Sequence, residues 1–369
     1  MRILVACDKF KGSLTAAEVG AALERGLTAA RPDVVVERLP VADGGDGTLL
    51  AALEAGFTRV PVTVTGPTGE PVDTAYARRG DLAVVEMADA SGLARLPDGP
   101  EPLNASCTGT GELMAAAVDA GCTSVVLGVG GSSSTDGGVG LAIGLGARVL
   151  DAGGRPIPLG GIGLELAVEL DLAPLRERLE GVTVRVASDV DNPLCGPRGA
   201  AAVYGPQKGA TPGDVVRLDA ALSRWADLVA DAVGRDLRDA PGAGAAGGTG
   251  FAAMALLDAD LRPGIETMLE LADFETRVAG ADLVVTGEGS LDAQSLHGKA
   301  PVGVASAAAR HAVPVVAVCG VSSLSEQELA LAGISGVWAL FDLEPDPARS
   351  MAEAARLLEI VGAELARSL

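Results

Sequence analysis

The chain begins with an alternation of short apolar runs and helical patterns. The run Arg2–Ala6 predicts a buried strand, and Thr15 with Glu18 forms a capping box that predicts the start of a helix. A second strand is predicted at Val34–Leu39 and a second helix at Leu49–Glu54. A β-α-β-α order of this kind favours a parallel sheet with right-handed crossovers.

From about residue 60 the apolar runs become more closely spaced. Strands are predicted at Arg59–Thr65, Pro71–Ala77 and Leu82–Met87, and glycine-bearing turns separate them. This spacing is typical of an antiparallel meander. We therefore predict an inserted α/β domain at residues 61–177.

The parallel pattern resumes after this insertion. Further strands are predicted at Val182–Ala187, Ala281–Val285, Val313–Val318 and Gly336–Leu340. Residues 346–369 read as one amphipathic helix. The parallel-sheet domain is thus predicted to be discontinuous, with residues 1–60 and 178–369 and approximate boundaries, and the fold class is α/β.

A glycine-rich segment, Gly128–Gly138, lies between a predicted strand at Thr123–Leu127 and a predicted helix at Val139–Leu145. Strand, glycine turn and helix together expose backbone N–H groups to an anion, and four consecutive hydroxyls add donors without charge. The alternative is a tight surface turn of small residues. We assign the loop to phosphate binding, and its candidate cofactor-binding residues are Gly130, Gly131, Ser132, Ser133, Ser134, Thr135 and Asp136.

Polar, glycine-bearing segments follow the predicted parallel strands. They are Asp8–Ser13, Asp43–Thr48, Ser188–Pro193 and Thr286–Asp292. Since open α/β sheets bind ligands at the carboxyl ends of their strands, these loops are predicted to form one wall of a cleft, with the Gly128–Gly138 loop on the other. Ordinary βα turns are the alternative. Further candidate cofactor-binding residues are Asp43, Asp46, Gly287, Glu288, Gly289 and Lys299.

Asp189 and Asp191 alternate at the end of a predicted strand. An extended backbone would point both side chains to one side. Such a pair suits a Mg²⁺ ion, or one carboxylate that takes a hydroxyl proton beside one that holds the metal. Both are therefore candidate catalytic and metal-binding residues, with Asp191 preferred as the base. The alternative for any single Asp here is a helix cap or Asx turn.

Charge and composition narrow the possible partners. The 369 residues carry a formal net charge of −21, which disfavours nucleic acid and anionic membranes as partners. The five cysteines are scattered without a C-x-x-C pair, which argues against a zinc site or disulfide framework, and no run approaches a membrane span. The N-terminus does not resemble a signal peptide, so a cytoplasmic protein is expected. A phosphate ligand in so acidic a chain needs local positive charge or a divalent cation.

Lysine is rare in this sequence and occurs only in glycine-bearing loops. Of 28 basic residues only four are lysines. A compact ammonium group can place a point charge on a phosphoryl or carboxylate oxygen in a narrow site, so Lys9 and Lys208 are candidate catalytic residues. Base composition is the alternative explanation for the scarcity of lysine, but it does not explain why all four lie in glycine-bearing loops. His297, beside Lys299, is a weaker candidate for a ligand contact.

Two common nucleotide-binding motifs are incomplete or stand in the wrong context. Gly298-Lys299 lacks the upstream glycine and the following Ser or Thr of a Walker P-loop. Gly242–Gly247 matches G-x-G-x-x-G but does not follow a strand, so it is interpreted as a flexible loop. A dehydrogenase is therefore disfavoured.

Six motifs in one order carry a resemblance to a known family. They are Asp8-Lys-Phe-Lys-Gly-Ser13, Pro40-Val-Ala-Asp-Gly-Gly-Asp-Gly-Thr48, Gly130-Gly-Ser-Ser-Ser-Thr-Asp-Gly-Gly138, Ser188-Asp-Val-Asp-Asn-Pro-Leu194, Tyr204-Gly-Pro-Gln-Lys-Gly209 and Thr286-Gly-Glu-Gly-Ser-Leu-Asp-Ala-Gln-Ser295. In these motifs the chain resembles the bacterial type-1 glycerate kinase family (glycerate 2-kinase) over nearly its whole length.

The resemblance implies ATP-dependent phosphorylation of D-glycerate, with 2-phosphoglycerate as the usual product. It also implies a flavodoxin-like domain interrupted by a second α/β domain, with the active site between them. Together with the residue chemistry, this predicts an ATP- and Mg²⁺-dependent kinase that acts by in-line phosphoryl transfer in an interdomain cleft. The alternatives are a kinase giving 3-phosphoglycerate or acting on another small hydroxy acid, and a non-catalytic sensor of nucleotide or organic acid.

Overall fold

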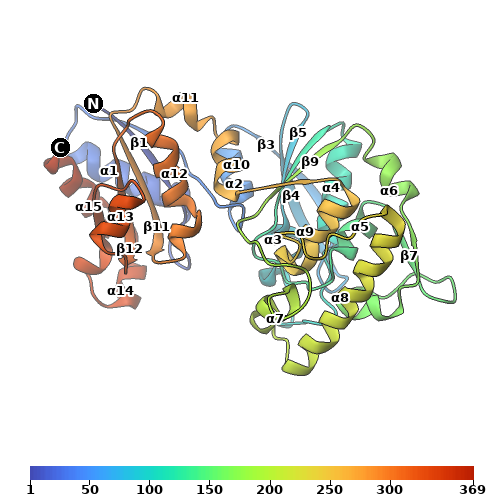
Figure 1. Cartoon of the computed structure of the whole chain (residues 1–369). Coiled ribbons are helices and arrows are strands. Elements are labelled where there is room, and N and C mark those ends of the chain that lie inside the picture. The colour runs from blue at the N-terminus through green and yellow to red at the C-terminus, as the bar shows by residue number, and fades with distance from the viewer. The chain divides into compact units, whose positions relative to one another are not determined.

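The computed structural model describes the backbone of residues 1–369 and every side chain except that of His297. The chain forms two compact units (Figure 1). The first comprises Met1–Asp43, Leu50–Gly56 and Pro263–Leu369, and the second comprises Gly44–Leu49 and Phe57–Arg262. The chain thus enters the second unit twice, first with a six-residue segment and then with a complete sheet domain.

The first unit is built on a parallel sheet of five strands. Its strands are β1 (Arg2–Cys7), β2 (Val35–Arg38), β11 (Leu283–Leu291), β12 (Val315–Ser322) and β13 (Val337–Ala339). Their spatial order is β2-β1-β11-β12-β13, and every neighbouring pair is parallel. Numbered along the chain this is the 2-1-3-4-5 order of flavodoxin-like sheets, whose strand order reverses between β1 and β11.

Helices cover both faces of this sheet (Figure 1). They are α1 (Ala16–Ala30), α10 (Gly264–Leu271), α11 (Phe274–Val278), α12 (Ala300–Ala309), α13 (Glu326–Leu331), α14 (Pro347–Ala352) and α15 (Ala354–Ser368), and α2 (Thr48–Glu54) spans the boundary of the two units. Helices α1 and α15 pack on one face so closely that a Cβ on Gly26 would lie 2.1 Å from the carbonyl oxygen of Glu359. The capping box of Thr15 and Glu18 is confirmed. The single helix predicted for residues 346–369 is broken at Glu353 into α14 and α15.

The second unit contains a mixed sheet of six strands. They are β3 (Thr58–Thr65), β4 (Pro71–Arg79), β5 (Leu82–Glu86), β6 (Ser124–Gly128), β9 (Thr183–Ala187) and β10 (Asp260–Arg262). Strands β3, β4 and β5 form the predicted antiparallel meander, which is confirmed. Strands β5, β6, β9 and β10 then run parallel in sequence order. The α/β fold class with parallel sheets and a meander is confirmed.

The second unit differs from the predicted insertion of residues 61–177. Strand β9 was expected to rejoin the first sheet, yet it pairs with β6 and β10, and the unit extends to Arg262. A short apolar strand has the same local pattern in either parallel sheet. Its sheet is decided by distant packing, and Val184 and Val186 lie in the core of the second unit.

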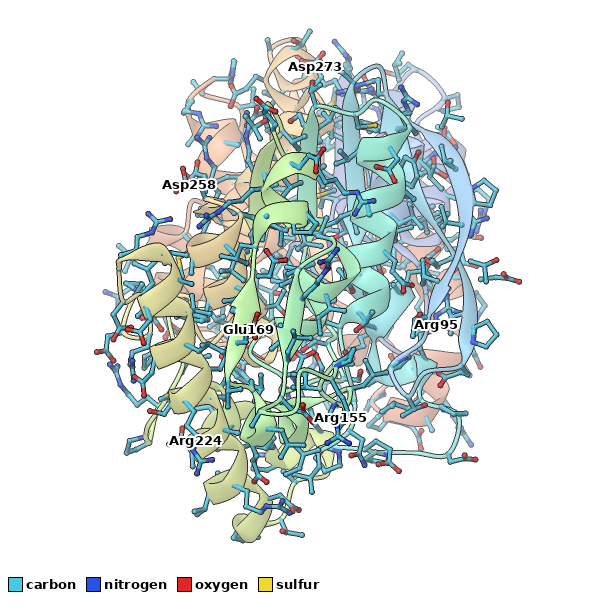
Figure 2. All side chains as sticks on the ribbon, turned by 90° about the vertical axis from the view of Figure 1, so that its right-hand side faces the viewer. Arg95, Arg155, Glu169, Arg224, Asp258 and Asp273 are labelled. Carbon is cyan, nitrogen blue, oxygen red and sulfur yellow. The ribbon has the colours of Figure 1, made fainter. Side chains whose placement is uncertain are left out.

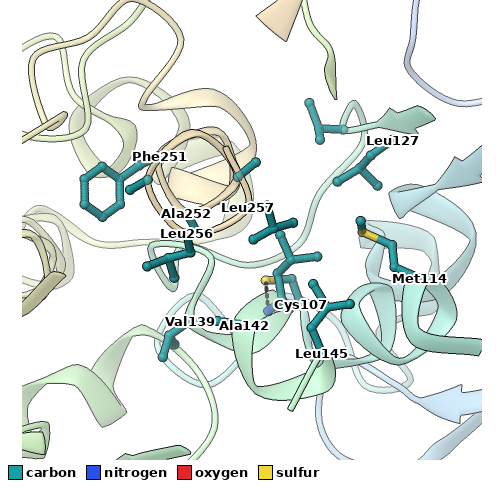
Figure 3. Packing of buried hydrophobic residues seen from close by; sticks show 14 of the residues in the cluster. Cys107, Met114, Leu127, Val139, Ala142, Leu145, Phe251, Ala252, Leu256 and Leu257 are labelled. Atoms are coloured by element: carbon teal, nitrogen blue, oxygen red, sulfur yellow. Dashed lines mark hydrogen bonds between the residues drawn. The ribbon is translucent and has the colours of Figure 1, made fainter. Parts of the chain in front are cut away.

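Helices and a small hairpin complete the second unit. They are α3 (Met87–Ser91), α4 (Thr108–Asp119), α5 (Val139–Gly144), α6 (Ala173–Arg178), α7 (Ala200–Tyr204), α8 (Pro212–Val233), α9 (Ala245–Leu256), and strands β7 (Arg148–Leu150) and β8 (Glu169–Asp171). Figure 3 shows part of the core of this unit, to which Cys107, Leu127 and residues of α5 and α9 belong. Charged residues such as Arg155 and Arg224, labelled in Figure 2, are exposed. Short 3-10 helices occur at Leu93–Arg95, Gly161–Leu166, Pro206–Lys208, Ser295–His297 and Leu340–Asp342.

Among the described residues, no helix is both long enough and apolar enough to cross a membrane.

Candidate active site

The Gly128–Gly138 loop follows β6 and leads into α5, as the sequence predicts. Three of its glycines, Gly131, Gly137 and Gly138, have φ between 66° and 72°. Residues with a Cβ avoid this left-handed region, so the turn depends on glycine there. The loop therefore has a defined shape that its own sequence favours.

The four hydroxyls of the loop are buried rather than open to solvent. Ser132 is 6% exposed, and Ser133, Ser134 and Thr135 are at most 1% exposed. The Ser133 hydroxyl donates to the carbonyl oxygen of Ser91 at 2.8 Å, and Ser132 Oγ accepts from Lys208. The surface of the loop is formed by Gly131, which is exposed, and Gly130, which is half-buried. The part of the loop that reaches the surface is thus its backbone at Gly130 and Gly131, and not its hydroxyls.

Asp136 serves the interior of the loop. It is fully buried, and its carboxylate accepts hydrogen bonds from the backbone N–H groups of Cys107 (3.0 Å), Gly138 (3.2 Å) and Gly140 (3.3 Å). Cys107 immediately precedes α4, and the two glycines stand at the start of α5. One carboxylate therefore satisfies N–H groups at the beginnings of two helices, where negative charge is favoured.

The Gly44–Leu49 segment lies across the carboxyl ends of the parallel strands. At the end of β6, the N–H of Gly130 donates to the carbonyl oxygen of Gly44 at 3.2 Å. At the end of β9, a Cβ on Gly44 would lie 2.9 Å from Ala187. The structure thus brings together two loops that the sequence predicts as candidate site segments.

Glu86 fixes this segment from the end of β5, and it was not predicted from the sequence. The carboxylate accepts hydrogen bonds from the N–H groups of Gly47 (3.1 Å) and Leu49 (2.8 Å), at the start of α2. Burial raises the pKa of Glu86, while these two hydrogen bonds act in the opposite direction. A carboxyl group at the end of an otherwise apolar strand was the available signal.

Three exposed acids border this edge of the second unit. Asp46 lies against Gly131, since a Cβ on that glycine would be 2.1 Å from Asp46 Oδ1. Asp189 and Asp191 follow β9 and are exposed, as a ligand-binding role requires. Among the described residues no group of three or more Asp, Glu, His or Cys side chains is arranged to hold a metal ion.

In the first unit, acids gather where the strand order reverses between β1 and β11. The N–H of Asp8 donates to the carbonyl oxygen of Gly287 at 2.8 Å, and Glu288 is the next residue of β11. The hydroxyl of Ser295 donates to Glu288. The carboxyl edge at such a reversal is where open α/β sheets place ligands. Asp8 was not among the predicted site residues, although it begins a predicted loop.

One predicted loop is mostly strand. Thr286–Asp292 was expected to follow its strand, but β11 continues to Leu291 and pairs with β12 as far as Ser322. Gly287 permits this, since a Cβ there would lie 2.2 Å from the carbonyl oxygen of Val318. Gly287, which suggested a loop, instead allows close packing within the sheet.

Burial dominates the acid chemistry of the first unit. It raises the pKa of Asp8 to about 7, with Asp43 and Glu288 adding to the rise and Lys9 opposing it. Burial also raises the pKa of Glu288. The ammonium groups lie close, with Lys9 Nζ 3.6 Å from Asp8 Oδ1 and Lys299 Nζ 3.9 Å from Glu288 Oε2. This edge therefore holds two carboxyl groups with raised pKa values, each with a lysine ammonium group within 4 Å.

The Gly242–Gly247 segment is not a flexible loop. Most of its residues are buried, and it leads into α9, where the N–H of Gly137 donates to the carbonyl oxygen of Gly247 at 2.9 Å. Ala246, Gly247 and Gly248 have positive φ values of 51°, 70° and 97°. The segment supports the glycine-rich loop. The side chain of His297, the weaker candidate, lies outside the described residues.

The structure defines an α/β protein with two sheets. In each sheet, charged and glycine-rich groups lie at the carboxyl ends of parallel strands. This placement is typical of enzymes that act on small anionic substrates. A family model described as the glycerate kinase family matches residues 3–369. The chain therefore belongs to the glycerate kinase family, and it is a kinase.

Similar proteins match this chain along nearly its full length. A glycerate kinase of Bacillus subtilis (strain 168) is 46% identical over 349 residues, covering 94% of this chain and 91% of the relative. The glycerate 2-kinase of Escherichia coli (strain K12) is 44% identical over 325 residues, covering 87% and 85%. The crystal structure of a putative glycerate kinase 2 from Salmonella typhimurium LT2 is 42% identical, with a TM-score of 0.86 and coverage of 100% of this chain and 98% of the other.

Proposed function

We propose that this kinase transfers the γ-phosphoryl group of ATP to the C2 hydroxyl of D-glycerate in the presence of Mg²⁺, giving 2-phosphoglycerate and ADP. The observation that carries this proposal is the family match over residues 3–369, together with the 44% identity to a relative named glycerate 2-kinase. A 3-phosphate product or another hydroxy-acid substrate is the rival outcome.

The residues at the Gly130–Gly131 edge suit nucleotide phosphates. Gly130 has no room for a side chain, since a Cβ there would lie 2.4 Å from Gly45 Cα. At Gly131 a Cβ would lie 2.1 Å from Asp46 Oδ1 and would have to displace that carboxylate. A backbone free of side chains can approach phosphate oxygens closely. In this proposal Gly130 and Gly131 meet the phosphates, and the buried residues Ser132 to Asp136 keep the loop in shape.

The exposed carboxylates suit Mg²⁺ as it is bound in kinases. Mg²⁺ usually takes one or two carboxylates, with the substrate phosphates and waters completing its shell, so a cluster of three acids is not needed. Asp189 and Asp191 are both exposed at the end of β9, and Asp189 is the proposed ligand, which leaves Asp191 to accept a proton. The bound ion would neutralise charge on the phosphate oxygens.

A base must take the proton of the attacking hydroxyl. In the proposed in-line step the glycerate oxygen forms a bond to the γ-phosphorus, the bond to the bridging oxygen of ADP breaks, and the hydroxyl proton passes to a carboxylate. Asp191 is the proposed base. Asp8 is the second candidate, since its pKa of about 7 lies near the operating pH. Lys9 and Lys299 are proposed to supply positive charge to substrate oxygens.

The test is product formation by the purified chain. With Mg²⁺, ATP and D-glycerate, ADP release is expected, and EDTA should abolish it. Coupling to enolase without a mutase identifies the product, since enolase consumes only 2-phosphoglycerate. ADP release without an enolase signal would support the 3-phosphate, and ATP hydrolysis independent of glycerate would reject the proposal.

A further inference from the structure

Lys208 is buried beneath the glycine-rich loop. It lies in the 3-10 helix Pro206–Lys208 of the second unit, and its side chain is among the largest that are fully buried, with 2% exposure. Its backbone is fixed as well, since the N–H of Lys208 donates to Gly205 at 2.9 Å and the following Gly209 has φ of 90°. The ammonium group therefore reaches its position from a rigid turn.

The ammonium group is bonded to the loop itself. Nζ donates to Ser132 Oγ at 2.8 Å and to the carbonyl oxygen of Ser134. These two acceptors flank Ser133, whose N–H and hydroxyl both bond to the carbonyl oxygen of Ser91. The loop is thus held from one side by Lys208 and from the other by Ser91.

A buried ammonium group is costly unless it is hydrogen-bonded and its charge is compensated. Burial lowers the pKa of Lys208 to about 8, and the buried carboxylate of Asp136 opposes this shift. Asp136 is also bonded to the backbone at the far end of the loop, at Gly138 and Gly140. Two buried charges of opposite sign therefore hold the two halves of the loop.

This placement argues against direct contact with substrate. The residues from Ser132 to Asp136 are all buried, and the ammonium group already donates to two of them. The exposed part of the loop is Gly131, with Gly130 half-buried. A lysine that neutralised a transferring phosphoryl group would need an open path to it.

We propose that Lys208 is a positioning residue, whose buried ammonium group holds residues 132–134 so that the Gly130–Gly131 backbone keeps the shape that binds nucleotide phosphates. The inference rests on the proposed function only in assigning nucleotide phosphates to this loop. It replaces the expectation, drawn from sequence, that Lys208 acts directly on the phosphoryl group.

The test compares Lys208→Met with Arg224→Met, which removes an exposed cation from α8 of the same unit. A positioning role predicts a KM for ATP that rises ~10-fold or more in Lys208→Met, because a hydrogen-bonded buried charge is lost, with a smaller change in kcat. Amide hydrogen exchange without ligand should also accelerate at Ser133 and at Leu93, whose N–H donates to Gly131. The Arg224→Met variant should change neither quantity.

The result that overturns the proposal is a fall in kcat with unchanged KM for ATP and unchanged exchange at Ser133 and Leu93, since this is the signature of charge stabilisation in the transition state. Ser132→Ala provides a milder variant that keeps the ammonium group and removes one acceptor. Ser132→Ala should also raise the KM for ATP and accelerate exchange at Ser133 and Leu93, by smaller factors. If Lys208→Met does not fold, Ser132→Ala tests the proposal in its place. Amide hydrogen exchange is measured without turnover, so it tests the positioning role of Lys208 independently of the kinase reaction. If the wild type did not phosphorylate D-glycerate, the kinetic assay would show this on its own.

Discussion

The carboxylate of Asp46 lies against the backbone of Gly131, so that a Cβ on this glycine would be 2.1 Å from Asp46 Oδ1. The two residues are far apart in sequence but belong to the same unit. Their contact joins the Gly44–Leu49 segment to the exposed end of the glycine-rich loop. It places an exposed negative charge beside the backbone that we assign to nucleotide phosphates.

Substituting Gly131 by alanine should impair nucleotide binding more than stability. The left-handed φ of 72° costs roughly 1–2 kcal/mol for a residue with a Cβ. The added methyl group must also displace the Asp46 carboxylate, which is exposed and can rotate away. We expect a modest loss of stability in denaturant unfolding and a rise in the KM for ATP.

Gly154→Ala is the matched control for this change. Gly154 has φ of 73°, and a Cβ added there would have no neighbour within 4 Å, so this variant reports the backbone strain alone. Its KM for ATP should stay at the wild-type value. Equal kinetic effects in both alanine variants would show that the contact of Gly131 with Asp46 has no part in nucleotide binding.

Asp8 should make the stability of the protein depend on pH in a direction unusual for an aspartate. The pKa of the folded form is about 7, against 3.8 for an ordinary Asp, so between these values the folded state binds the extra proton. The contribution of Asp8 to stability is therefore full below pH 4 and is lost as the pH rises through 7. Relative to wild type, Asp8→Asn should gain up to about 4 kcal/mol between pH 4 and pH 8.

Urea unfolding at several pH values measures this gain, with the exposed Asp98 changed to Asn as the control. Asp98→Asn should follow the wild-type curve. A constant stability difference between Asp8→Asn and wild type across this range would mean that Asp8 is ionised throughout it.

Lys208 should produce the opposite slope at alkaline pH. Its folded pKa of about 8 lies below the ordinary value of 10.5, so the unfolded state binds more protons between these values. Stability then rises with pH from 8 to 10.5, by about 3 kcal/mol. Lys208→Met should lack this rise, and Arg224→Met should keep it. Identical slopes in all three proteins would show that burial does not lower the pKa of Lys208.

Local sequence patterns were sufficient to predict the elements that have turn or capping residues of their own. The meander β3–β5 has turn residues between its strands, and α1 carries its capping box, so both were predicted close to their observed bounds. The strand and helix on either side of the glycine-rich loop were also predicted. In each case the information lies within a few consecutive residues.

Long-range packing determines the features that local sequence patterns did not predict. Nothing within β9 distinguishes pairing with β6 from pairing with a strand of the first sheet. The loop hydroxyls were expected to face a ligand, but all four are buried, and those of Ser133 and Ser132 bond to Ser91 and Lys208, which are distant in sequence. Glu86 was missed for the same reason, since its partners Gly47 and Leu49 come from a segment that precedes it by almost forty residues.

The paired acids after β9 should give two different defects. Asp189 and Asp191 are exposed, so asparagine at either position should leave the fold intact. If Asp191 accepts the hydroxyl proton, Asp191→Asn should lower kcat by roughly 10²–10⁴-fold while ATP still binds. If Asp189 holds Mg²⁺, Asp189→Asn should instead need more Mg²⁺, and excess metal or Mn²⁺ should partly restore its activity.

Steady-state kinetics across a Mg²⁺ titration separates these defects, with circular dichroism as the folding control. Asp231→Asn, an exposed acid on α8, is the matched variant and should behave as wild type in both respects. A near-normal kcat in both Asp189→Asn and Asp191→Asn would exclude them as the base. The base would then be sought at Asp8, because its pKa of about 7 and its place at the strand reversal between β1 and β11 suit proton acceptance near neutral pH. In that case Asp8→Asn should show the loss of kcat expected for Asp191→Asn, without a raised Mg²⁺ requirement.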